Sequence, residues 1–349
     1  MARRAHKRQI TIIQVAEACG VSTQTVSRVI NNRPDVSDET RQRILEAIRR
    51  LNYQPNALAR SLIHRRTHTI GVVTSGIDYY GPSRILVGIE EQASSMGYSL
   101  LLHLLHDPAT VDHQDTLGGL ISRQVDGIIW AVPEIGNNLY WVSERLPKLT
   151  FPIVFLNAHL LKEAIRVRID NLRGGQLATQ HLIEQGRREI GLITGPLDWV
   201  EAVERKRAWQ RTIHAAGLSA DEGHIVNGDW SPQSGERAMH QLLQQCPKLD
   251  AVFVSNDQMT LGALKAVNEL GRRVPHDIAM VGFDDIPEAS YFQPPLTTIR
   301  QPLHDLGVQA VQKLVHLILN EEAYQQEKTI EANILLPELV IRRSSVIPT

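Results

Sequence analysis

Three polar side chains near the N-terminus are of the types that read the edges of DNA bases. Thr23, Gln24 and Arg28 stand within six successive positions. Gln can form two hydrogen bonds with adenine, Arg can form two with guanine, and Thr can contact a thymine methyl group or a base edge. If they share the first turns of one helix, that helix is suited to the major groove.

The charge of the same region points to a polyanionic partner. Residues 1–66 hold thirteen Lys and Arg against five Asp and Glu, a net charge of +8. Since the whole chain carries −1, the remaining 283 residues carry −9. A basic end on an acidic body is typical of a nucleic-acid-binding head on a regulatory or catalytic body, although a solvated run of charge is the plainer alternative.

Helix signals place these side chains on a helix-turn-helix. Thr11 and Gln14 can form a capping box for a first helix that stops at Gly20, and Ser22 can cap a second helix over residues 23–30. A third helix, capped by Ser37, is predicted to end at residues 52–55. Residues 56–63 form a further segment that is too short to be a stable helix alone in water, so we expect it to become helical on DNA.

A second group of polar residues follows short apolar runs farther along the chain. Parallel sheets bind ligands at the carboxyl ends of their strands, where such residues converge. Carboxylates and amides hold paired hydroxyls well, which favours a polyhydroxylated ligand, although each residue alone could instead be a helix cap. The residues concerned are Thr74, Ser75, Asp78, Asn157, Asn256, Asp257, Asp284 and Asp285.

The elements that must position this second group alternate between strand and helix. Predicted strands are 70–73, 99–105, 127–132, 152–156, 190–194, 251–254 and 278–283, with a last one at 335–341. Helical patterns between them include 84–96, 174–185 and 260–270. This alternation predicts parallel sheets covered on both faces. About 280 residues exceed what one such sheet usually needs, so we expect two α/β subdomains with a cleft between them.

Other bulk features narrow the class of protein. No export signal and no apolar run of membrane-spanning length is visible. The two cysteines, Cys19 and Cys246, are too few for a disulfide framework and too isolated for a zinc site, so a reducing cytoplasm is expected. We find no phosphate-binding loop, nucleophile elbow or metal-spaced histidine pair, and we therefore expect no enzyme activity, cofactor or metal.

Residues 13–31 and 51–62 together resemble the headpiece of the LacI/GalR repressor family, and the similarity continues through the body, for example at 255–263 and 281–285. The resemblance implies an all-α helix-turn-helix headpiece joined to a periplasmic-binding-protein-like α/β core of two subdomains. Its boundaries would be 1–66 for the headpiece with its hinge helix, 56–63, and 67–349 for an effector-binding and dimerisation core. The N-subdomain would cover about 68–168 and 300–330, and the C-subdomain about 169–299 and 331–349.

The resemblance also implies roles for individual residues. Thr23, Gln24 and Arg28 would contact base edges, and Leu62 would wedge between the central base pairs, with the plainer alternative that it packs on the body. The DNA-binding candidates are Thr11, Ser22, Thr23, Gln24, Thr25, Ser27, Arg28, Asn31, Asn56, Ala59 and Leu62. The effector-binding candidates are Ser75, Tyr79, Asn157, Arg205, Trp230, Asn256, Asp284 and Leu303.

The implied function is a nucleoid-associated repressor that binds a pseudo-palindromic operator as a homodimer and is released by a small sugar. Asn157, Glu201 and Ala131 depart from the pattern that the body otherwise resembles, so the identity of the sugar stays open. Two alternatives also stay open: a regulator whose ligand tightens DNA binding, and a sugar-binding protein without a DNA function. We expect no association with a membrane.

Overall fold

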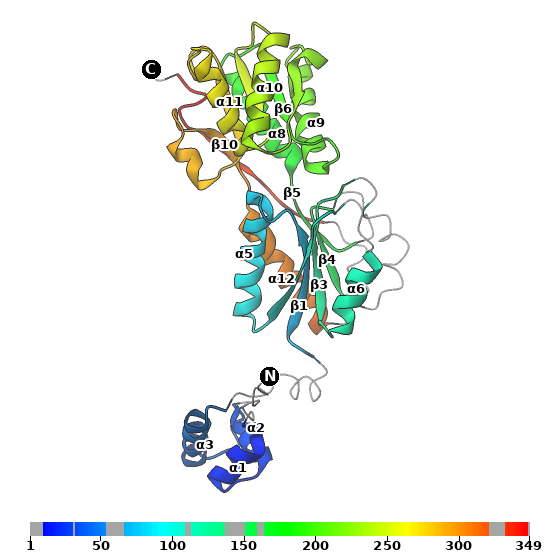
Figure 1. Ribbon diagram of the computed structural model, residues 1–349, viewed down its shortest axis with the longest axis vertical. Helices are drawn as coiled ribbons and strands as arrows, with labels where there is room; N and C mark the ends of the chain where they lie inside the picture. Colours follow the sequence, from blue (N-terminus) through cyan, green and yellow to red (C-terminus); the bar gives the residue numbers. More distant parts are fainter. Residues whose placement is uncertain are drawn as a thin grey trace, which may run out of the picture. The chain divides into compact units, whose positions relative to one another are not determined.

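The computed structural model describes residues 10–30, 32–53, 66–108, 113–135, 138, 151–158, 164–320 and 332–347. The contacts of the chain divide it into two compact units, Met1–Thr67 and His68–Thr349 (Figure 1). We call the first unit the headpiece and the second the core.

The headpiece contains three helices whose ends are set by local hydrogen bonds. Helix α1 spans Ile12–Cys19, α2 spans Thr23–Ile30 and α3 spans Asp38–Leu51. The Thr11 N–H donates to the Gln14 side chain at 2.9 Å, and the Thr25 N–H donates to Ser22 Oγ at 3.1 Å. Gly20 ends α1 in the left-handed conformation, at a φ of 60°, which a glycine adopts without strain. The predicted helix-turn-helix and its third helix are therefore present.

A small apolar core holds these three helices together. Each helix buries residues at helical spacing, so that one face of each turns inward. Burial of a side chain the size of Val26 or Val29 contributes about 1.5–3 kcal/mol. The buried residues are Val15, Ala16, Cys19, Val26, Val29, Ile44 and Ala47.

The first half of the core is a six-stranded sheet in the order β11-β5-β4-β3-β1-β2, parallel throughout. Helices α5 (Tyr80–Ser95), α6 (His113–Ser122) and α12 (Leu303–Leu319) belong to this half. Two apolar clusters, one on each face, enclose the central strands, as expected for a buried parallel sheet. Its strands are β1 (Thr69–Ser75), β2 (Ser99–Leu105), β3 (Gly127–Ala131), β4 (Ile153–Leu156), β5 (Arg166–Ile169) and β11 (Asn333–Leu335).

The second half repeats this design with the strand order β12-β10-β9-β8-β6-β7, in which only β12 is antiparallel to its neighbour. Its helices are α8 (Asn171–Glu184), α9 (Val200–Ala215), α10 (Pro232–Gln245) and α11 (Asp257–Glu269), with the short 3₁₀ helices η2 (Glu222–His224) and η3 (Pro287–Tyr291). Its strands are β6 (Ile190–Thr194), β7 (Ile225–Asn227), β8 (Ala251–Val254), β9 (Ala279–Asp284), β10 (Thr297–Arg300) and β12 (Glu338–Val340).

The chain passes between the two halves three times, after β5, after β10 and after β11 (Figure 1). The third passage, after β11, differs from the path that the sequence predicted. One strand was predicted over 335–341, and 331–349 was assigned to the second subdomain. Instead β11 pairs with β5 in the first sheet and β12 pairs with β10 in the second. Both β11 and β12 contain apolar residues that are wholly or partly buried in their own sheets, so the two short strands look like one continuous strand in the sequence.

Helices α5 and α12 pack closely against each other because glycine stands at their contact. A Cβ atom at Gly307 would lie 2.3 Å from the carbonyl oxygen of Ile85, and one at Gly88 would lie 2.1 Å from that of His304. No other residue fits there without moving a backbone. The contact fixes the middle of α5 against the start of α12, and residues of both helices line a cavity in the core.

Candidate functional site

The second helix of the headpiece exposes its polar residues and buries its apolar ones. Thr23, Gln24 and Arg28 are exposed, whereas Val26 and Val29 are buried against the other helices. Arg28 makes a half-exposed ion pair with Asp35 at 3.4 Å. Such a surface pair contributes little, so the guanidinium can exchange it for another partner. The polar face of α2 is thus available to a ligand.

Two candidate DNA contacts also cap this helix. Ser22 Oγ lies 2.9 Å from Thr25 Oγ1 and accepts the Thr25 N–H. Four other candidates, Asn31, Asn56, Ala59 and Leu62, lie outside the residues that the structure describes.

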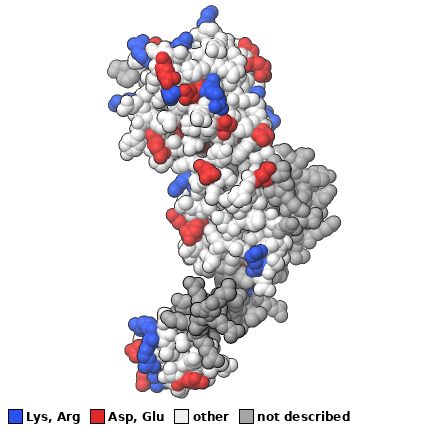
Figure 2. Space-filling model, viewed as in Figure 1, with Lys and Arg blue, Asp and Glu red and all other residues white. Residues whose placement is uncertain are grey.

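Figure 2 shows Lys and Arg gathered along the side of the headpiece where α3 lies, while both signs of charge are scattered over the core. Helix α3 carries Arg41, Arg43, Arg49 and Arg50.

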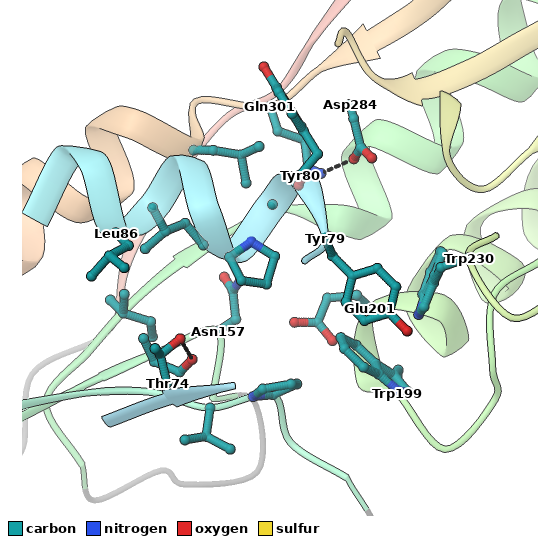
Figure 3. Close-up of a pocket in the computed structure, with 18 of the residues that line it drawn as sticks. Thr74, Tyr79, Tyr80, Leu86, Asn157, Trp199, Glu201, Trp230, Asp284 and Gln301 are labelled. Atoms are coloured by element: carbon teal, nitrogen blue, oxygen red, sulfur yellow. Dashed lines mark hydrogen bonds between the residues drawn. The ribbon is translucent and has the colours of Figure 1, made fainter. Parts of the chain in front are cut away.

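A cavity of about 920 Å³, including space open to solvent, is lined by residues from both halves of the core (Figure 3). Apolar and aromatic side chains with a few converging polar groups are the usual lining of a small-molecule site. Its apolar lining comes from the first half, mainly from α5 and from strand ends. The apolar lining there includes Val72, Pro82, Ile85, Leu86, Ile89, Val132, Pro133, Leu156 and Leu303.

Three aromatic rings from different elements form one wall of the cavity. Tyr79 immediately precedes α5, Trp199 precedes α9, and Trp230 follows β7. The ring centroids of Tyr79 and Trp199 are 6.1 Å apart and those of Trp199 and Trp230 are 5.9 Å apart, both edge to face. Trp230 is buried, and its indole N–H has no hydrogen-bond partner among the described residues. A wall of this kind can pack the apolar face of a sugar ring and offer it a donor.

Arg205 is the buried cation of the site. Its Nε donates to Asn171 Oδ1 at 2.9 Å and its Nη1 to the carbonyl oxygen of Ser255 at 2.6 Å. The guanidinium carbon lies 3.7 Å from the centroid of the Phe283 ring. Burial lowers the pKa of Arg205, and the nearby negative charge of Asp284 opposes that shift. The side chain is therefore held in a fixed orientation at the cavity.

Asp284 is the acid at the end of β9, and its backbone φ of 121° lies in a region that L-residues rarely adopt. Burial raises the pKa of its carboxyl group to about 6, against the opposing effects of Arg205 and of a hydrogen bond from Gln301. The Gln301 amide donates to Asp284 Oδ1 at 2.6 Å (Figure 3). Backbone strain is kept where the surrounding structure enforces it, often at ligand sites.

Two amides complete the polar lining. The Asn256 side chain caps α11 by accepting the Met259 N–H at 2.8 Å, and it donates to the carbonyl oxygen of Trp230 at 3.1 Å. The Asn157 side chain accepts the Ile169 N–H at 3.2 Å, and its backbone is left-handed, with a φ of 49°. Asn256 is a helix cap and cavity lining at once, whereas Asn157 lines the cavity and holds the end of β5 without capping a helix.

The cavity collects seven of the eight effector-binding candidates: Tyr79, Asn157, Arg205, Trp230, Asn256, Asp284 and Leu303. Ser75 is buried at the end of β1 and does not line it. Residues absent from the candidate set also line it, among them Thr74, Tyr80, Trp199, Glu201, Gln258 and Gln301. From the sequence, Glu201 was named only as a departure from the family pattern; it stands four residues before Arg205 and so shares its face of α9.

Comparisons with known proteins agree with this architecture. Residues 11–56 match the model described as bacterial regulatory proteins, lacI family, and residues 179–345 match the periplasmic binding protein-like domain. The HTH-type transcriptional repressor PurR of Photorhabdus laumondii is 38% identical over 339 residues, 96% of this chain and 97% of the relative. The ribose operon repressor of Escherichia coli is 38% identical over 318 residues, 90% of this chain and 95% of the relative.

A solved structure of the lac repressor dimer bound to operator and the anti-inducer ONPF superposes with a TM-score of 0.86. It is 32% identical and covers 97% of this chain and 100% of its own. A helix-turn-helix joined to a two-subdomain core with an interdomain cavity defines a ligand-responsive transcriptional regulator. More particularly, the chain belongs to the lacI family of bacterial regulatory proteins, whose relatives named above are repressors and not enzymes.

Among the described residues, no helix is long and apolar enough to cross a membrane.

Proposed function

We propose that this protein represses transcription as a homodimer on a pseudo-palindromic operator and is released by a sugar bound in the core cavity. The observation that carries the proposal is the convergence of Arg205, Asn256 and Asp284 with an aromatic wall on one cavity of a lacI-family chain. The solved relative is described as a dimer on operator DNA, and a two-fold dimer reads two half-sites.

The DNA contacts would come from α2 and the hinge. Thr23, Gln24 and Arg28 would read base edges, because they are the exposed residues on the first turns of α2. Thr11, Ser22, Thr25, Ser27 and Asn31 would hold phosphates near the groove. In the hinge, Asn56 and Ala59 would lie in the minor groove, and Leu62 would open a base step there.

The effector would be a sugar or a glycoside. Its hydroxyls would bond to the side chains of Arg205, Asn256 and Asp284, and an apolar ring face would pack on Trp230. One solved relative is a cellobiose complex of the regulator CelR, which is 34% identical and covers 96% of this chain, while a sugar-binding regulator that is 26% identical is complexed with phosphate. The apolar lining beside α5 would hold any apolar part of a sugar or glycoside.

The effector would act by favouring one arrangement of the two halves of the core. A ligand contacting both halves prefers the arrangement that closes the cavity, and coupling of about 1–3 kcal/mol is typical of such regulators. The hinge segments of the dimer would then separate and lose their helical structure, which lowers operator affinity. If the ligand instead favoured the DNA-binding arrangement, the protein would be regulated by corepression.

The chain would have no catalytic activity, and it would act in the cytoplasm on the nucleoid. The relatives support the first point, because those matched over nearly their whole length are named as repressors. The basic headpiece supports the second.

A thermal-shift screen of the full-length protein against mono- and disaccharides tests the effector proposal, since a bound ligand raises Tm by mass action. The sugars that raise Tm are then added to the protein on its operator, with fluorescence anisotropy as the readout. We expect Arg205→Gln to lose the Tm shift, whereas Arg207→Gln, an exposed residue of the same helix, retains it. Equal shifts in both variants would reject the cavity as the effector site.

A further inference from the structure

Three potential metal ligands of different chemical types meet at one edge of the second half of the core. Glu189 immediately precedes β6, His224 ends η2 and immediately precedes β7, and Cys246 caps the end of α10. One ligand atom of each lies within 4.8 Å of the others. Because β6 and β7 are parallel, the first two residues stand at the amino ends of their strands. The effector cavity takes its residues from the carboxyl ends, so the two sites are distinct.

The spacing of the three ligand atoms matches a tetrahedral zinc ion. His224 Nε2 lies 3.3 Å from Glu189 Oε2 and 3.5 Å from Cys246 Sγ, and Sγ lies 3.9 Å from the same carboxylate oxygen. Zinc bonds to nitrogen, oxygen and sulfur place the ligand atoms of a tetrahedral site roughly 3.3–3.6 Å apart. A shift of a few tenths of an ångström in one side chain would therefore accommodate the ion.

A fourth residue orients the imidazole for such a role. His224 Nδ1 lies 2.7 Å from Asp221 Oδ1, so the ring nitrogen bearing the proton faces the carboxylate and Nε2 is the one left to bind. Asp221 is itself fixed, since it accepts the Gly223 N–H and the Ser219 hydroxyl, each at 3.0 Å. Metal-binding histidines commonly donate their second N–H to a carboxylate in this way, and the partner holds the ring in place.

The burial of the cluster leaves one open side. His224 and Cys246 are buried, whereas the Glu189 side chain is 44% exposed. An ion could enter past Glu189 and retain a water molecule as its fourth ligand. Both buried ligands sit at the ends of regular elements, which fix their backbone positions.

We propose that Glu189, His224 and Cys246 form a site for Zn²⁺ or a divalent ion of similar softness. Thiolate and imidazole select such ions over Mg²⁺ and Ca²⁺. The Cys246 thiol gives up its proton to solvent as the metal–sulfur bond forms, with no change of oxidation state. The bound ion ties β6, β7 and α10 together and stabilises the second half of the core.

The same residues allow one competing explanation, in which a protonated His224 bridges Asp221 and Glu189 and the thiol is incidental. A second cluster offers a useful control. Glu236, His240 and Glu269 also lie close together, but Lys265 bridges the two acids, at 2.5 and 2.9 Å. That position already holds a cation, so it should not take up a metal ion.

Co²⁺ titration of the reduced, metal-stripped full-length protein tests the site, because thiolate–cobalt bonds give a charge-transfer band and tetrahedral cobalt gives intense ligand-field bands. We expect one Co²⁺ per chain with both signals, and displacement by Zn²⁺. Cys246→Ser should lose the charge-transfer band, whereas Cys19→Ser and His240→Gln should keep it. Asp221→Asn should weaken Zn²⁺ binding by about 10–100-fold.

A cooperative thermal unfolding transition confirms that the core of each variant is folded. The absence of a charge-transfer band in the wild-type protein would overturn the proposal in favour of the bridging imidazolium. So would a band that persists in folded Cys246→Ser, since the sulfur ligand would then lie elsewhere.

Discussion

Effector affinity should depend on pH through the carboxyl group of Asp284. Burial raises its pKa to about 6. The positive charge of Arg205 and the hydrogen bond from Gln301 stabilise the ionised form, but they do not fully offset the effect of burial. A sugar hydroxyl donates to the ionised carboxylate, so binding should favour that form. Affinity is therefore expected to rise as pH increases through 6.

The magnitude follows from the fraction ionised. At pH 5 about one molecule in ten carries the charged form of a group with a pKa of about 6, so Kd should be about tenfold larger at pH 5 than at pH 8. Asp284→Asn should weaken binding by about 1.5–3 kcal/mol, the usual contribution of a hydrogen bond to a charged group, and should remove the pH dependence.

The stability of the ligand-free core should change in the opposite direction. A carboxyl group whose folded pKa is raised above 3.8 favours the folded state while it is protonated. This contribution of Asp284 to the free energy of unfolding is fully present below the pKa of the carboxyl group in the unfolded chain, and it is lost as pH rises through about 6. A bound sugar should compensate for the loss, so its Tm shift should be larger at pH 8 than at pH 5.

Isothermal titration calorimetry with a sugar from the screen, at several pH values between 5 and 8, measures these effects in the wild-type protein and in Asp284→Asn. A Kd that is constant over this range in the wild type would refute the assignment of Asp284 as an ionised ligand. A pH dependence that survives in the variant would assign it to another group.

Three further outcomes are expected. Arg28→Ala should cost about 1–3 kcal/mol of operator affinity and relax the preference at one base pair in a binding-site selection, whereas an equal loss on all sequences would indicate a phosphate contact. Leu62→Ala should weaken specific binding, measured by anisotropy, far more than non-specific binding, and an equal fall in both would contradict the wedge. Gly307→Ala should destabilise the core by about 1–3 kcal/mol in urea unfolding, because its Cβ would meet the Ile85 carbonyl oxygen. Gly118→Ala has open space around it in α6 and should stabilise the core by about 0.5–1 kcal/mol; equal effects would reject the close packing of α5 and α12.

The headpiece could be predicted from the sequence because its signals are local. The caps at Thr11 and Ser22 and the stop at Gly20 stand directly beside the helices whose ends they set. Strands made almost entirely of apolar residues, such as β6 and β8, were predictable for the same reason. The short strands β5, β7 and β10 were missed, since they have three or four residues and include polar ones.

The cavity could be predicted only in part. Its acids and amides at strand ends, such as Asp284 and Asn256, follow a rule of parallel sheets. Trp199 and Gln301 were missed because neither lies in a helix or a strand with a periodic pattern of apolar residues. Trp199 lies in the turn before α9, and Gln301 lies in the passage that follows β10. Ser75 was expected there on its position alone, but the end of β1 buries it.

The metal cluster shows the same limit more sharply. The sequence interpretation treated Cys246 as too isolated for a zinc site. His224 precedes it by 22 positions and Glu189 precedes His224 by 35. The pairing of β6 with β7 and the packing of α10 against these strands bring the three residues together. Ligand spacing in a sequence detects sites built on one loop or helix, not sites built across a sheet edge.

The most direct test of the central claim is the operator affinity of the full-length protein measured with and without a sugar that raises its Tm. The operator would come from a selection of genomic fragments, and the affinity from anisotropy at fixed salt. At a sugar concentration that fills the wild-type cavity but lies below the Kd of Asp284→Asn, we expect the sugar to lower operator affinity about 5–150-fold in the wild-type protein. The same concentration should have little effect in Asp284→Asn, which should still bind the operator. An operator affinity that the bound sugar leaves unchanged in the wild type would contradict the claim that the cavity controls the headpiece.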